Sequence, residues 1–279
     1  MSWFARRLVR ARTRPYTRPV ATEASISRDP TADLVRLGVV HAVVIAVPVL
    51  VVGLLVLPIW AAPLLAIVAG VAVTALRIRG VDARVADALG ARRVQADDHP
   101  RYAGVVESTS MATGVARPLL HVIDDPARNA VVWGSGIGPC SIAVTTGLLE
   151  AAERIELEAV VAHLLTDVRD GAVEAATIAS GLFAPLAGGP LAGIVARLAR
   201  AGEDERRIAL ADIEAARATQ YPPGAVAALE RVRDGASGVA RSPRPLQPLW
   251  FAAPSEPSAE DPFAVHPPLA DRIDLLREL

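Results

Sequence analysis

The distribution of hydrophobic and polar positions divides the chain into three regions. Residues 37–76 form a run of forty positions without an Asp, Glu, Lys or Arg. As one straight helix this run would be about 60 Å long, twice the thickness of a bilayer's hydrocarbon core. Pro58-Ile-Trp-Ala-Ala-Pro63 interrupts it, and Trp60 is a residue typical of membrane interfaces. We therefore predict a transmembrane helical hairpin with arms near residues 37–57 and 62–76.

Arginines flank this apolar run on both sides. Six of them precede the first acidic residue, Glu23, in a basic arm that covers residues 1–36. Arg77, Arg79 and Arg84 follow the run closely. Because basic residues favour the cytoplasmic side, this pattern predicts a multi-pass protein of the inner membrane with both ends, and the main domain, in the cytoplasm. Contact with anionic lipids is an alternative role for the basic arm.

Residues 77–279 have the patterning of an aqueous domain. Short apolar runs at 120–124, 129–133 and 142–146, each bounded by Pro, Asp or Gly, predict strands. Longer segments carry apolar residues at helical spacing or a mixture of charges typical of exposed helices, and these are residues 81–93, 153–170, 203–219 and 266–279. A further short strand is expected at residues 249–252. The fold class is therefore α+β, mostly helical.

Residues 175–196 are the ambiguous part of this domain. They carry no charge, but they are rich in alanine and are interrupted by several glycines and prolines. The length allows a third membrane or interfacial segment, whereas the composition makes insertion marginal. A buried helical hairpin within the domain is the alternative, and the sequence leaves both interpretations open.

Charge and composition exclude several functions. The 29 basic residues balance 30 acidic ones, and a net charge of −1 argues against a nucleic-acid partner. Every basic residue is an arginine, so Schiff-base chemistry and a phosphate-binding lysine are excluded. The single cysteine excludes an intramolecular disulfide and a cysteine-built zinc site.

Several segments of the domain resemble segments of a known protein family and follow one another in the same order along the chain. The matching stretches are Asn129-Ala-Val-Val-Trp-Gly134, Ile142-Ala-Val-Thr-Thr-Gly-Leu-Leu149, Glu156-Leu-Glu-Ala-Val-Val-Ala-His163, Arg207–Asp212 and His266-Pro-Pro-Leu-Ala-Asp-Arg-Ile273. Together they span about residues 101–273, and in this region the chain resembles the HtpX-like membrane zinc metallopeptidases, which are related to prenyl-protein-processing peptidases. The resemblance implies a metallopeptidase-like domain attached to the N-terminal hairpin.

The residues that carry this family's chemistry are mostly replaced. In the family, two histidines and a later glutamate bind zinc, and a glutamate beside the first histidine acts as general base. His163 matches the first histidine, but Leu164 stands at the general-base position and Asp167 at the second histidine. Ile208 stands at the third ligand, whereas Asp212 matches the family's following aspartate, which supports the metal ligands from outside.

These replacements predict a pseudopeptidase with no intact catalytic residue and no cofactor, in which His163 is a vestigial ligand. Leucine and isoleucine neither bind a cation nor take a proton, and water without a metal or a base is a poor nucleophile. The alternative is an active zinc-dependent metalloendopeptidase whose metal is held by His163, Asp167 and Glu205.

The resemblance also implies where such a protein binds its partners. The stretch that contains Asn129, Ala130, Val131 and Gly134 matches the family's edge strand, to which a peptide adds by β-augmentation. The expected partners are unfolded or membrane peptides, or an active homologue that the protein regulates, in membrane protein quality control. A third hypothesis is a membrane scaffold in which only the hairpin and the basic arm matter.

Overall fold

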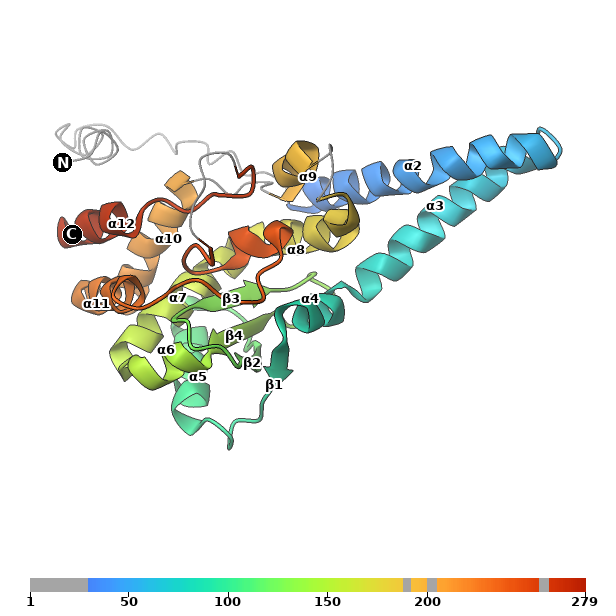
Figure 1. The fold of residues 1–279 in the computed structure, drawn as a ribbon. Helices are drawn as coiled ribbons and strands as arrows, with labels where there is room; N and C mark the ends of the chain where they lie inside the picture. The colour runs from blue at the N-terminus through green and yellow to red at the C-terminus, as the bar shows by residue number, and fades with distance from the viewer. Residues whose placement is uncertain (1–29, 188–191, 200–204, 256–260) are drawn as a thin grey trace, which may run out of the picture.

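A computed structural model describes residues 30–187, 192–199, 205–255 and 261–279. Two long helices, α2 (Pro30–Val56) and α3 (Ala61–Arg79), project together from one side of the remaining elements, as Figure 1 shows. The hairpin helices therefore extend beyond the predicted range of 37–76 at both ends. Residues 1–29, most of the predicted basic arm, lie outside the described residues.

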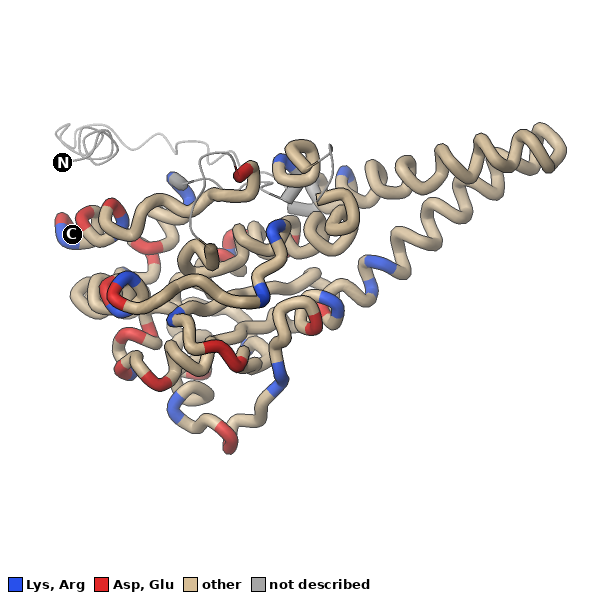
Figure 2. The backbone as a smooth tube through the Cα atoms, in the orientation of Figure 1, with Lys and Arg blue, Asp and Glu red and all other residues tan. Residues whose placement is uncertain are grey.

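The hairpin is long and apolar enough to cross a membrane. The most apolar 18-residue stretch of α2 has a mean hydropathy of 2.9, and 11% of it is buried. The corresponding stretch of α3 has a mean hydropathy of 2.0, and 22% of it is buried. So much exposed apolar surface distinguishes the two helices from the core helices of a soluble domain. Figure 2 shows charged residues only near the base of the hairpin.

The two arms of the hairpin are also joined by polar contacts. His41 Nδ1 of α2 lies 2.8 Å from Thr74 Oγ1 of α3, and both side chains are buried. The Thr74 hydroxyl in turn donates to the carbonyl oxygen of Gly70 at 2.8 Å. A Cβ atom on Gly70 would lie 2.6 Å from the carbonyl oxygen of Ala42, so the helices approach too closely there for any other residue.

The domain contains one four-stranded sheet with the order β1-β2-β4-β3. Its strands are β1 (Ala91–Arg93), β2 (Leu119–Ile123), β3 (Ala130–Trp133) and β4 (Ser141–Thr145). β2 and β4 are parallel, and the other two pairings are antiparallel. The three predicted strands therefore form β2, β3 and β4. The prediction of one helix over 81–93 is wrong at its end, because residues 91–93 form β1.

Helices pack around this sheet and around one central helix, α7 (Arg154–Arg169). The others are α4 (Val81–Leu89), α5 (Pro100–Thr113), α6 (Thr146–Ala151), α8 (Ala172–Phe183), α9 (Ala192–Ala199), α10 (Glu205–Ala218), α11 (Pro222–Arg233) and α12 (Leu269–Arg277), with 3₁₀ turns η1 (Ala184–Leu186) and η2 (Arg244–Leu249). α7 contacts α5, α10 and α11, and a continuous core joins these helices to the sheet. The α+β, mostly helical fold with an N-terminal hairpin is confirmed.

The ambiguous segment 175–196 begins as a helix buried inside the domain. Ten of the twelve residues of α8 are buried, and the helix is too short to span a bilayer. Phe183 packs in one cluster with Leu37 at the base of α2, and its ring centroid lies 5.7 Å from that of His41. α8 is therefore a buried helix that packs against the base of the hairpin, and a membrane or interfacial role for the rest of the segment stays a prediction.

Candidate functional site

The site is built on α7, whose start is fixed by a paired glutamate. Glu156 accepts a hydrogen bond from the backbone N–H of Glu153 at 2.8 Å, which satisfies one free donor at the helix start. The same carboxylate pairs with Arg231 of α11, with N–O distances of 3.0 and 3.1 Å. These contacts set the position of α7 against α11, and His163 follows Glu156 two helical turns later on the same chain segment.

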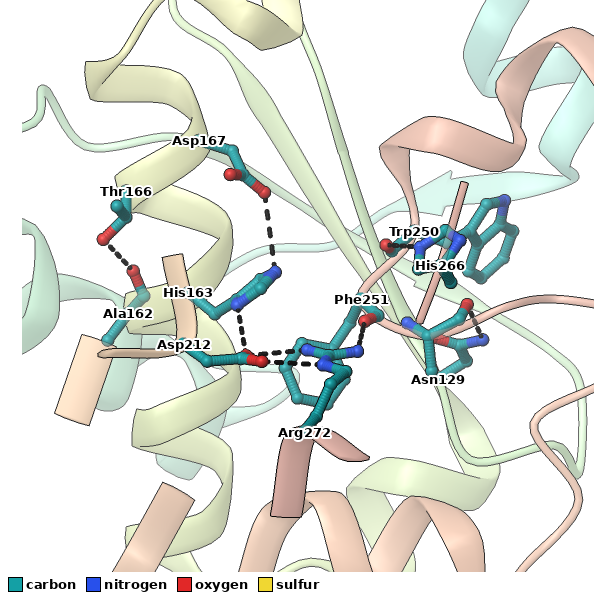
Figure 3. A network of polar contacts seen from close by, with 11 residues as sticks. Asn129, Ala162, His163, Thr166, Asp167, Asp212, Trp250, Phe251, His266 and Arg272 are labelled. Atoms are coloured by element: carbon teal, nitrogen blue, oxygen red, sulfur yellow. Dashed lines mark hydrogen bonds and ion pairs between the residues drawn. The ribbon is translucent and has the colours of Figure 1, made fainter. Parts of the chain in front are cut away.

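His163 lies in a buried polar network between α7, α10 and α12 (Figure 3). Its Nδ1 atom is 2.8 Å from Oδ1 of Asp212, and only 2% of its side chain is exposed. Arg272 of α12 donates to both oxygens of Asp212 at 2.7 Å and to the carbonyl oxygen of Phe251 at 2.7 Å. Three segments distant in sequence thus meet at one carboxylate.

The other ring nitrogen of His163 faces its own helix. Nε2 lies 3.6 Å from Oδ2 of Asp167, one turn later on α7. The ring of Phe251 meets the imidazole edge-on, with centroids 5.0 Å apart, and Arg272 lies 5.0 Å above the same phenyl ring. Phe251 therefore packs against the histidine, and both side chains are buried.

The pKa values of the two carboxylates shift in opposite directions. Burial raises the pKa of Asp212, but the charges of Arg272 and His163, with the hydrogen bonds they make, outweigh it and bring the value to about 2. The ionised Asp212 is therefore a hydrogen-bond acceptor at neutral pH. Burial raises the pKa of Asp167, and the charges of His163 and Arg207 offset only part of that rise.

The residues present do not fit the zinc site of the family that the sequence resembles. Leu164 is fully buried and Ile208 is 3% exposed, and neither has an atom that binds metal. Asp167 and Asp212 lie against different nitrogens of His163, so their oxygens do not converge on one point as zinc ligands must. Among the described side chains, no three His, Cys, Asp or Glu are grouped to hold a metal. The predicted substitute Glu205 begins α10, but its side chain lies outside the described part.

Comparison with known proteins identifies the family. A protein named "Protease HtpX homolog" from Dictyoglomus thermophilum is 30% identical over 218 residues, which cover 67% of this chain and 72% of the relative. The chain belongs to the HtpX family. HtpX homologues from Tropheryma whipplei and Streptococcus uberis are 29% and 26% identical, each over 68% of this chain and 76% of the relative.

No family model and no solved structure matches the chain. The relatives and the two exposed apolar helices together make this protein a membrane-located HtpX homologue.

The predicted peptide-binding edge of this HtpX homologue is covered in part by its own chain. Val131 of β3 forms an antiparallel bridge with Trp250, and Phe251 donates its backbone N–H to the carbonyl oxygen of Ala130 at 2.8 Å. The predicted peptide-binding edge over Asn129–Gly134 is therefore contacted at Ala130 and Val131 by residues 250–251, and peptide binding there stays a prediction. The predicted short strand at 249–252 is reduced to this single bridge, because η2 includes Leu249.

Asn129, predicted to contact a peptide, instead binds that closing segment. Its amide donates to the carbonyl oxygens of Ser237 and Ala252 at 3.0 Å each, and its Oδ1 accepts from the backbone of Ala130 at 2.9 Å and of Ala252 at 3.2 Å. At the far end of the edge, the backbone N–H of Gly134 donates to Thr177 Oγ1 at 3.1 Å. The outer edge of β3 is therefore contacted at Ala130, Val131 and Gly134 by other segments of the chain.

Sequence reasoning missed Arg272 and Phe251 as members of the site. Arg272 is 1% exposed, and its segment matched the family pattern without a role being assigned to the arginine. The available signal was a charged residue next to Ile273, on the apolar face of a short terminal helix. A buried arginine requires a buried acid, and Asp212 is the acid that meets it.

Proposed function

We propose that this HtpX homologue is a catalytically inactive pseudopeptidase that acts by binding in membrane protein quality control. The observation that supports the proposal is Leu164, which is fully buried and which the family resemblance matches to the general-base position. A leucine takes no proton from water, and the donors around His163 supply no zinc site in its place. The retained buried network supports the domain as a folded binding unit.

We also propose that the domain lies on the cytoplasmic face of the inner membrane. Positive charge at both ends of the hairpin supports this orientation, with Arg36 before the apolar part of α2 and Arg77 and Arg79 at the end of α3. A fusion of a periplasm-active reporter to residue 279 should stay inactive, and an active reporter would contradict the orientation.

The partner that the structure favours is a membrane protein, and we propose an active HtpX relative. The contacts of residues 250–251 with Ala130 and Val131 compete with capture of an extended peptide on β3, whereas α2 and α3 expose apolar side chains along their length. The test measures casein cleavage by an active relative in the same membrane, with and without this protein. Cleavage should change only when the hairpin is intact, and an unchanged rate would contradict regulation by contact.

The first test of inactivity is the zinc content of the full-length protein purified in detergent. We expect a ratio near zero per chain, unchanged after incubation with zinc, and no chelator-sensitive cleavage of casein. A ratio near one that falls in a His163→Ala variant would instead establish the alternative, a zinc metalloendopeptidase with His163, Asp167 and Glu205 as ligands.

A restored variant supplies the matched control. The combined substitutions Leu164→Glu, Asp167→His and Ile208→Glu rebuild the base and both lost ligands on the existing fold. This variant should bind about one zinc ion per chain, because a site of two histidines and a glutamate meets the requirements of a catalytic zinc. Failure of a folded restored variant to bind zinc would show that these three positions do not face a former metal site.

A further inference from the structure

A cavity of about 290 Å³ opens where the membrane hairpin joins the domain. Its walls come from the end of α3, from α4, from the end of α8 with η1, and from the proline-rich segment around η2. Val85, Pro185 and Leu246 are among the apolar residues that line it, and Arg77 and Arg84 are its charged ones. This volume is near the lower end of the range for small-molecule sites, enough for part of a lipid.

The two arginines have no acidic partner among the described residues. No ion pair joins Arg77 or Arg84 to a carboxylate there, and no Asp or Glu lines the cavity. The Arg84 guanidinium instead donates to the backbone carbonyl of Arg77 at the end of α3, which places both charges at the same helix end. Asp82, on the same helix as Arg84, accepts from the hydroxyl of Ser135 at 2.7 Å.

A hairpin that spans a bilayer would bring this cavity to the depth of the lipid headgroups. α3 has 19 residues and is about 28 Å long, which matches the hydrocarbon thickness of a bilayer. With the 57–60 turn of the hairpin at the far face, Arg77 at the opposite end of α3 stands at the level of the phosphates. Basic residues in a pocket beside a membrane helix are a known way to bind anionic headgroups.

We propose that this cavity binds one anionic phospholipid from the surrounding leaflet. The phosphodiester would accept hydrogen bonds from Arg77 and Arg84, since the planar guanidinium matches phosphate oxygens. The proline and aliphatic wall would cover the glycerol and the first carbons of an acyl chain, and the rest of the chain would remain in the bilayer beside α3. The site is separate from the His163 network and does not depend on whether the domain is catalytic.

The test uses full-length protein in detergent and native mass spectrometry with equal amounts of dioleoylphosphatidylglycerol and dioleoylphosphatidylcholine. We expect one retained phosphatidylglycerol molecule in preference to phosphatidylcholine. Each of Arg77→Gln and Arg84→Gln should lower that retained fraction about fivefold. Ala184→Phe, at an exposed position on the cavity wall, should abolish it by filling the space.

Arg79→Gln is the matched control, because Arg79 lies at the same end of α3 but does not line the cavity. It should retain phosphatidylglycerol like the unmodified protein. An equal loss of bound phosphatidylglycerol in Arg79→Gln, or equal binding of the two lipids, would overturn the proposed site. Either result would show that binding depends only on the general positive charge of the surface. Displacement by an equal concentration of glycerol 3-phosphate would overturn the lipid assignment. Circular dichroism of each variant checks that the fold is retained.

Discussion

Asp212 lies 2.8 Å from Nδ1 of His163 while both of its oxygens bind Arg272 at 2.7 Å. In zinc enzymes a carboxylate at this ring nitrogen fixes the orientation of a metal-binding histidine. In this chain the contact between Asp212 and His163 is present, while the family resemblance predicts Leu164 and Ile208 at the positions of the base and the third ligand. We interpret the pair as a supporting contact that now serves the packing of α7, α10 and α12.

Replacement of Arg272 tests this structural role. Arg272→Met leaves Asp212 ionised and buried without its main partner, so the free energy of unfolding should fall by about 3–5 kcal/mol. Denaturant unfolding of the full-length protein in detergent measures the change. Arg233→Met, which breaks an exposed pair with Asp234, should cost less than about 1 kcal/mol. Equal losses in the two variants would show that the buried pair is not special.

The low pKa of Asp212 predicts a dependence of stability on pH. The folded pKa is about 2 and the unfolded value is about 3.9, so the group's stabilisation is fully present above about pH 4. It is lost as the pH falls towards the folded pKa, because the unfolded state then binds the proton more readily. Asp212→Asn removes this titration. Its free energy of unfolding should therefore change less than that of the unmodified protein between about pH 4 and 2. If the free energies of unfolding of the two proteins changed in parallel with pH, the low folded pKa of Asp212 would be contradicted.

The sequence predicted those elements whose pattern is local. Uncharged residues 37–76 indicated the hairpin, and apolar runs bounded by turn residues indicated β2, β3 and β4. The end of α4 had a local signal as well, because Gly90 has a φ of +66° that favours glycine and stops the helix. Extending the helix to residue 93 overlooked this glycine.

The sequence did not predict contacts between distant segments. Arg272 meets Asp212 across 60 positions, and Asn129 meets Ala252 across 123. No spacing rule connects residues so far apart in the chain. The ambiguity of residues 175–196 has the same origin, since a buried alanine-rich helix and a marginal membrane segment have similar composition, and only packing distinguishes them.

The closing segment over β3 should depend on Asn129. Asn129→Ala removes both hydrogen bonds with Ala252, and amide hydrogen exchange at Phe251 and Ala252 should accelerate at least tenfold. Asn129→Asp keeps the acceptor for the backbone N–H of Ala252 and should accelerate exchange less. Mass spectrometry of peptides that cover residues 249–254 measures both. Unchanged exchange in the alanine variant would show that the backbone contacts of Ala130 and Val131 hold the segment alone.

Two glycines of the hairpin predict opposite effects of the same substitution. A Cβ atom on Gly70 would lie 2.6 Å from the carbonyl oxygen of Ala42, whereas one on Gly38 would meet nothing within 4 Å. Alanine favours a helix over glycine by about 0.5–1 kcal/mol, so Gly38→Ala should be neutral or stabilising. Gly70→Ala gains the same preference but forces α2 and α3 apart, at a cost of about 1–3 kcal/mol, and weakens the contact between His41 and Thr74. Thermal unfolding of the full-length protein in detergent should therefore shift downwards for Gly70→Ala alone. Equal shifts for both variants would mean that the two arms do not pack as closely as the Gly70 contact indicates.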